Sequence, residues 1–136
     1  MTPPRVVLDT NVWISGLLWL GNPYRCLRLA YAGLVKPLYC QAMLAELAIK
    51  LRETFHFSES RIEAVAYDFR RLGELVEVTG NLRVVTADSD DDKFIECAIS
   101  GGATVIISSD HHLLDLGSYG GIRILNAGQF LADWKT

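Results

Sequence analysis

Residues 6–12 of the chain are VVLDTNV, an apolar β-branched run that stops at an acid. The run predicts a short buried strand over Arg5–Leu8, and the polar triplet that begins at Asp9 can cap a following helix. A similar pattern recurs late in the chain, where Val105–Ile107 precedes two serines and Asp110. In open α/β sheets the ligand site lies beyond the carboxyl ends of the strands, so both acids are candidates for such a site.

Short apolar runs alternate with segments of helical spacing along the rest of the chain. We expect further strands at Val35–Cys40, Leu75–Val78, Leu82–Val85 and Ile122–Leu125, with Pro37 favouring an edge or an irregular start for the first of them. We expect helices at Val12–Leu18, Tyr24–Ala32, Gln41–Thr54, Ser58–Leu75, Asp92–Ser100 and Ala127–Trp134. Strands separated by helices favour an α/β protein with a parallel sheet covered on both faces.

Length and composition indicate a single domain over residues 1–136. Thirteen Lys and Arg against sixteen Asp and Glu give a net charge of −3, which weakens any model in which a broadly basic surface binds nucleic acid. The three cysteines (Cys26, Cys40 and Cys97) are widely spaced, and we expect small buried side chains in a reducing cytosol. The longest apolar stretch, Val12–Leu20, is too short for a membrane helix, so we expect a cytoplasmic protein.

Four of the sixteen acids fall within residues 88–92, at the start of a predicted helix. Acids are favoured there by the helix dipole, which can explain Asp90 and Asp91 without any function. Carboxylates that converge in one cleft would instead repel each other, and a divalent cation would remove this repulsion. Mg²⁺ or Mn²⁺ suits an all-carboxylate site and serves phosphoryl transfer.

The VVLDTNV motif, together with Glu46, Asp92 and the Ser108-Ser109-Asp110 ending, resembles the PIN-domain nucleases. The most similar subgroup is the bacterial VapC-like toxins of toxin–antitoxin pairs, and the similarity runs over essentially the whole chain. The resemblance implies a three-layer α/β/α sandwich with a mostly parallel central sheet. It also implies a metal-dependent endoribonuclease that uses Mg²⁺ or Mn²⁺, an RNA substrate and a cognate antitoxin protein.

The resemblance assigns four acids to the site, one at a time. Asp9 matches the first metal-binding acid, Glu46 the second, Asp92 the third and Asp110 the acid after the fourth strand. Asp9 could instead serve only as a helix cap, and Glu46 could lie on a solvated helix face. The neighbouring acids, among them Asp90, leave the register of the third position open by one or two residues.

Asp90 and three further residues are supporting candidates. Ser108 stands where the family often has a Thr that orients the first Asp or a water, and Asn11 matches the polar residue beside that Asp. The subgroup commonly continues after Asp110 as Lys-Asp-Leu-Leu, whereas this chain has His111-His112-Leu113-Leu114. His112 could therefore bind metal, donate to a scissile phosphate or lie in solvent.

Two other functions compete with the nuclease. A phosphatase with an aspartyl nucleophile would need Asp-x-Asp after the first strand, and position 11 is Asn. A non-catalytic PIN-like module that binds RNA or regulates remains the main alternative.

Leu17, Leu18, Trp19 and Leu20 follow one another, and a single helix face cannot bury four consecutive large apolar residues. We therefore expect a homodimer through the first helices. The alternative is a hydrophobic corner packed under the turn that follows.

Overall fold

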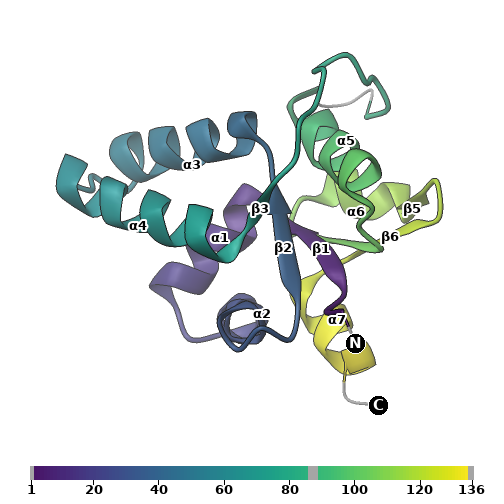
Figure 1. Cartoon of the computed structure of the whole chain (residues 1–136), viewed down its shortest axis with the longest axis horizontal. Coiled ribbons are helices and arrows are strands. Elements are labelled where there is room, and N and C mark those ends of the chain that lie inside the picture. Colours follow the sequence, from purple (N-terminus) through teal and green to yellow (C-terminus); the bar gives the residue numbers. More distant parts are fainter. Residues whose placement is uncertain (1, 86–88, 135–136) are drawn as a thin grey trace.

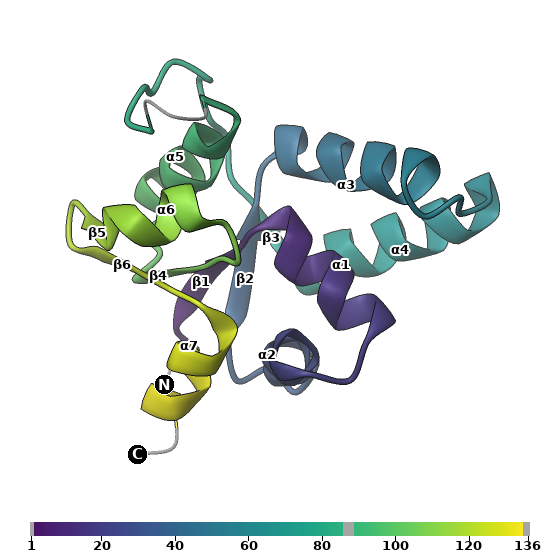
Figure 2. The same cartoon turned by 180° about the vertical axis from the view of Figure 1, so that it is seen from behind.

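The computed structural model describes residues 2–85 and 89–134, which form a central sheet with helices on both faces (Figures 1 and 2). The strand order within this part of the chain is β3-β2-β1-β4-β6-β5. Neighbouring strands are parallel except for the last pair, β6 and β5. The strands are β1 (Arg5–Leu8), β2 (Lys36–Tyr39), β3 (Glu74–Leu75), β4 (Val105–Ile107), β5 (Ser118–Tyr119) and β6 (Ile122–Leu125). The predicted α/β/α architecture with a mostly parallel sheet is confirmed.

Helices cover the two faces of the sheet in different ways. One face carries α5, which packs across β1, β2 and β4, whereas α1, α2 and α7 lie on the opposite face (Figures 1 and 2). The pair α3 and α4 pack against each other beside the β3 edge (Figure 1). The helices are α1 (Thr10–Leu18), α2 (Asn22–Tyr31), α3 (Gln41–Glu53), α4 (Glu59–Leu72), α5 (Asp92–Gly101), α6 (His111–Leu116) and α7 (Ala127–Trp134), with a 3₁₀ turn η1 at Ser89–Asp91.

The core is built on the two central strands. Val6, Val7 and Ile106 have no exposed surface, because both faces of β1 and β4 are covered. The bounds predicted for Arg5–Leu8, Val105–Ile107, Ile122–Leu125 and Ala127–Trp134 are those of β1, β4, β6 and α7. All three cysteines are free and buried, as predicted. Among the described helices, none is both long enough and apolar enough to cross a bilayer.

The predicted strand Leu82–Val85 is wrong, and the one predicted at Leu75–Val78 shares only Leu75 with the observed strand β3. Residues 76–85 have no regular structure. The N–H of Val76 still donates to the Tyr39 carbonyl of β2, but side chains of α5 accept from N–H groups of residues 79–85 in place of a neighbouring strand. The sequence pattern does not predict α6 or β5. Both are short, and too few residues carry a periodic pattern.

The long helix predicted over Ser58–Leu75 is shorter at both ends. Ser58 lies outside it as the cap, and its hydroxyl accepts a hydrogen bond from the N–H of Arg61. Gly73 ends α4, and a Cβ at this position would lie 2.7 Å from the ring of Tyr39. A larger residue here would have to displace the Tyr39 ring.

Pro37 does not mark an edge strand, because β2 lies between β1 and β3. Successive residues of a strand direct their N–H groups to opposite sides, and the N–H of Lys36 donates to the Pro4 carbonyl on the β1 side. The nitrogen of Pro37 therefore faces β3, which pairs only with Leu38 and Tyr39. The absence of an N–H group at Pro37 therefore removes no hydrogen bond between β2 and β3.

Candidate functional site

A cavity of about 170 Å³ opens at the carboxyl ends of β1 and β4. These two strands pair in parallel with Leu8 opposite Ile107, so the residues that follow them meet at one edge of the sheet. The cavity is lined mostly by polar side chains from the ends of both strands, from α3 and from η1. They are Asp9, Thr10, Asn11, Glu46, Lys50, Asp90, Asp91, Phe94 and Asp110. We call this cavity the acid pocket.

Asp9 is held in one orientation by three hydrogen bonds. Its Oδ1 accepts from the N–H of Val12, 2.8 Å away, as the cap of α1. Its Oδ2 accepts from the Ser108 hydroxyl at 2.5 Å and from the N–H of Ser109 at 3.1 Å. Burial raises the pKa of Asp9, and these three donors together with the charge of Lys50 offset part of that effect. Asp9 is thus both a helix cap and a buried wall of the pocket.

Asp110 is tied to the same hydroxyl. Its N–H donates to Ser108 Oγ at 2.9 Å, so this hydroxyl accepts from one acid's backbone and donates to the other acid's carboxylate. The Oδ1 of Asp110 in turn accepts from the N–H of His112 at 2.8 Å and caps α6. Ser108 itself has no exposed surface. The two strand-end acids are therefore positioned as one unit.

Glu46 reaches the acid pocket from α3 and forms an ion pair with Lys93. The Nζ of Lys93 lies 2.9 Å from Glu46 Oε2, and both side chains are mostly buried. Burial alone would raise the pKa of Glu46. The nearby Thr10 hydroxyl and the charges of Lys93 and Lys50 outweigh that effect and hold the pKa below its usual range. Glu46 is thus ionised in the folded protein at neutral pH.

Asp92, the predicted third acid, does not line the acid pocket. It is 3% exposed, and its Oδ1 accepts hydrogen bonds from the N–H groups of Val84 (2.9 Å) and Val85 (2.7 Å). Asp90 and Asp91, which belong to the tight turn η1 before α5, line the pocket instead. The structure therefore brings together Asp9, Glu46 and Asp110 with the two acids of η1.

Sequence reasoning missed the positive charges at this site. Lys50 lines the acid pocket, and its Nζ donates to Oδ1 of Asn11 at 3.0 Å. Lys93 bridges from the Glu46 carboxylate to the Asp90 carbonyl. The only sequence signal for Lys50 is its place four residues after Glu46, a spacing that usually marks a solvated helix face.

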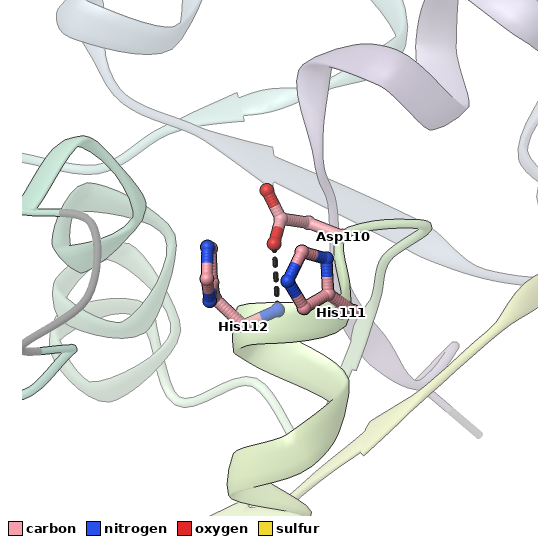
Figure 3. Close-up of side chains that lie close together, drawn as sticks. All are labelled: Asp110, His111 and His112. Atoms are coloured by element: carbon pink, nitrogen blue, oxygen red, sulfur yellow. Dashed lines mark hydrogen bonds between the residues drawn. The ribbon is translucent and has the colours of Figure 1, made fainter.

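His112 is not one of the residues that line the acid pocket. Its ring packs on that of His111, with the ring centroids 4.0 Å apart. The ligand atoms of both imidazoles and of Asp110 lie within 4.8 Å of one another (Figure 3). The three residues thus form a compact group next to the pocket, sharing Asp110 with it.

The Glu46–Lys93 pair predicts a pH-dependent stability. Folding lowers the pKa of the Glu46 carboxyl group below its ordinary value of 4.5. Such a group stabilises the folded protein at pH values above that ordinary pKa, and this stabilisation disappears as the pH falls through the lowered pKa. We expect Lys93→Gln, with chelator present, to lower the free energy of unfolding by about 1–2 kcal/mol at pH 7. The deficit should shrink toward zero near pH 3. Urea denaturation at both pH values measures it.

The exposed pair Arg52–Glu59, with side chains 46% and 70% exposed, provides the matched control. Arg52→Gln should change the stability little at either pH, because solvent screens exposed ion pairs. An equal loss in Lys93→Gln at pH 7 and pH 3 would show that the lysine acts through packing alone.

Comparison with known proteins places the chain in a family. The family model of the PIN domain matches residues 5–112, which include every acid of the pocket. No curated protein matches the chain. The solved structure of VapBC2 from Rickettsia felis, bound to a DNA fragment from its promoter, has a chain with a TM-score of 0.62 and 14% identity; the match covers 90% of this chain and 98% of that one.

The PIN domain of RRP44 from T. brucei has a TM-score of 0.53 and 13% identity, over 98% of this chain and 82% of that one. At such identities the two structures show a common fold. The match to the family model extends over most of the chain and carries the assignment: this protein belongs to the PIN domain family.

Proposed function

We propose that this protein is a metal-dependent endoribonuclease that hydrolyses RNA phosphodiester bonds at the acid pocket. One observation carries the proposal: carboxylates that follow β1 and β4 converge with those of α3 and η1 on one cavity in a chain of the PIN family. Asp9, Glu46 and Asp110 are the metal-binding and catalytic residues, with Asp90 and Asp91 of η1 in the place that the sequence had assigned to Asp92. Asn11 and Ser108 support them.

The donor set of the pocket fits a hard divalent cation. Five carboxylates line it against one lysine, and oxygen ligands of this kind are those that Mg²⁺ and Mn²⁺ prefer. Burial raises the pKa of Asp9, and a nearby cation would favour its ionised form. When bound, such an ion neutralises charge on the phosphate and makes water a better nucleophile.

The protein's own side chains provide the positioning. The Ser108 hydroxyl holds Asp9 in a single rotamer, so its carboxylate loses little freedom when it binds a ligand. Lys50 on the wall of the pocket supplies a positive charge for a phosphate oxygen of the RNA. The cavity of about 170 Å³ is smaller than ordinary ligand pockets, which suits a phosphate group better than a base. Specificity for bases must then come from outside this cavity.

We further propose that the protein is the toxin of a toxin–antitoxin pair and binds a cognate antitoxin. The proposal is supported by the VapC-like motifs of the sequence and by the fold shared with a chain of the VapBC2 structure.

We expect Asp9→Asn to lose RNA cleavage with Mn²⁺ by about 100-fold or more, because loss of outer partners of metal ligands alone costs about 10–100-fold. The wild-type protein should leave 5′-phosphate ends on the RNA products when Mn²⁺ is present. It should lose its activity when a chelator is added. Saturating Mn²⁺ should also raise the melting temperature of wild type by several degrees, and that of Asp9→Asn much less. Gel assays with a structured RNA and thermal scans measure both effects.

Asp115→Asn is the control, since Asp115 lies exposed on α6 and outside the acid pocket. It should behave as wild type in both assays. If Mn²⁺ stabilises wild type but no RNA is cut, the non-catalytic alternative is favoured. If Asp9→Asn and wild type respond equally to Mn²⁺, Asp9 is not a ligand.

If Asp91 and not Asp92 is the third acid of the site, substitutions at these two neighbouring positions should have opposite effects. Asp91→Ala should reduce cleavage and the stabilisation by Mn²⁺, because Asp91 lines the pocket. Asp92→Ala should keep the response to Mn²⁺ but lower the free energy of unfolding by about 1–3 kcal/mol, because the N–H groups of Val84 and Val85 lose their acceptor. The reverse pattern in thermal and urea denaturation would restore Asp92 as the ligand.

We also propose a homodimer through the end of α1. Trp19 and Leu20 are 59% and 86% exposed, and adjacent exposed apolar side chains of this size favour a protein contact. Light scattering should give about 30 kDa, twice the 15.1 kDa of one chain. Leu20→Asp should be monomeric, whereas Leu34→Asp, at a leucine that is 50% exposed elsewhere, should stay dimeric. A wild-type monomer at micromolar concentration would contradict the proposal.

A further inference from the structure

We propose that Asp110, His111 and His112 form a second cation site, which takes a transition-metal ion such as Zn²⁺ and adjoins the acid pocket through Asp110. The three residues are consecutive and stand at the start of α6. Figure 3 shows the two imidazoles flanking the carboxylate. The two sites share Asp110, whereas His111 and His112 lie outside the acid pocket.

The distances are close to those of a metal site. One ligand atom from each residue can be chosen so that all three lie within 4.8 Å of one another. A tetrahedral Zn²⁺ with bonds of about 2.0–2.1 Å holds its ligands about 3.4 Å apart. Each side chain therefore has to move by only about 1 Å to bind one ion. His111 is exposed and His112 half-buried, so both rings have room for this rotation.

The ring nitrogens are available. Within residues 2–85 and 89–134, neither imidazole makes a hydrogen bond; His112 uses only its backbone N–H, which donates to Oδ1 of Asp110. The dashed line in Figure 3 marks this bond, and the other carboxylate oxygen points away from the helix. The bond fixes the carboxylate beside the two rings before any ion arrives. Such positioning lowers the entropic cost of binding.

Electrostatics around the group favour a cation. Asp110 contributes a negative charge, and the acids of the neighbouring pocket add to the negative potential. The positive end of the α6 dipole opposes a cation, but this helix has only six residues and its first turn is already capped by Asp110. The electrostatic potential at this group of three residues is therefore negative.

The ligand types separate this site from the acid pocket. Imidazole nitrogen suits Zn²⁺, Ni²⁺ and Cu²⁺, whereas Mg²⁺ prefers oxygen ligands and keeps its waters. A site with two imidazoles and one carboxylate therefore selects transition metals. Three protein ligands also leave a coordination position for water or a phosphate oxygen.

The experiment is a calorimetric titration with Zn²⁺ in excess Mg²⁺, which competes with Zn²⁺ for sites made of carboxylates alone but not for imidazole nitrogens. We expect one Zn²⁺ per wild-type chain, and binding at least tenfold weaker in the double variant His111→Ala/His112→Ala. His56→Asn is the matched control: His56 is the only other histidine and has a positive φ of 55°, which Asn tolerates. It should bind Zn²⁺ as wild type does. Circular dichroism should show that the double variant is folded, since neither ring is in the core.

Asp9→Asn separates this inference from the nuclease proposal. It should keep Zn²⁺ binding, because Asp9 is not one of the three ligands, even where its response to Mn²⁺ is lost. Equal Zn²⁺ affinity in the double variant and wild type would overturn the second site, whatever the nuclease assays give. The second site would also be overturned if Asp9→Asn lost Zn²⁺ binding and the double variant retained it. The ion would then occupy the acid pocket.

Discussion

The hydroxyl of Ser108 joins the ends of the two central strands, and the geometry of the acid pocket depends on it. It donates to the carboxylate of Asp9 after β1 and accepts from the N–H of Asp110 after β4. Because Ser108 is fully buried, both bonds lie where water cannot compete for them. The parallel register of β1 and β4 brings the strand ends together, and this hydroxyl then sets the orientation of the acids at those ends.

The charges of the pocket are balanced in part from within the chain. Lys93 pairs with Glu46, and Lys50 lies on the pocket wall. Burial raises the pKa of Asp9 and the charge of Lys50 offsets part of that rise, whereas the same charge helps to lower the pKa of Glu46. A cluster of carboxylates without such partners would repel and destabilise the fold. The two lysines therefore let the site form before a cation binds, and the same charges are suited to a phosphate.

Helix α5 uses its acids for a different purpose. Asp92 and Glu96 lie four residues apart, hence on one face of the helix, and both accept hydrogen bonds from the irregular segment that precedes η1. Glu96 binds the N–H groups of Thr79 and Gly80, and these donors outweigh burial and lower its pKa. A strand in this segment is thus replaced by carboxylate acceptors. Asp92 is part of that arrangement, which explains why its side chain is not at the pocket.

The sequence alone determined the fold class and the two acids at the strand ends. A β-branched run that stops at an acid specifies a buried strand and a polar residue at its tip, so the residue pattern is enough to place Asp9 and Asp110 at the edge of the sheet. Period and spacing likewise defined β4, β6 and α7.

The tertiary structure decided which two of three consecutive acids line the pocket. Asp90, Asp91 and Asp92 have the same chemistry, and only the turn η1 and the backbone of residues 84–85 distinguish them. It also decided that Lys50 and Lys93 come to the carboxylates, and that His111 and His112 pack side by side at Asp110. These are contacts of individual side chains, whose directions follow from packing between distant elements and leave no periodic trace in the sequence.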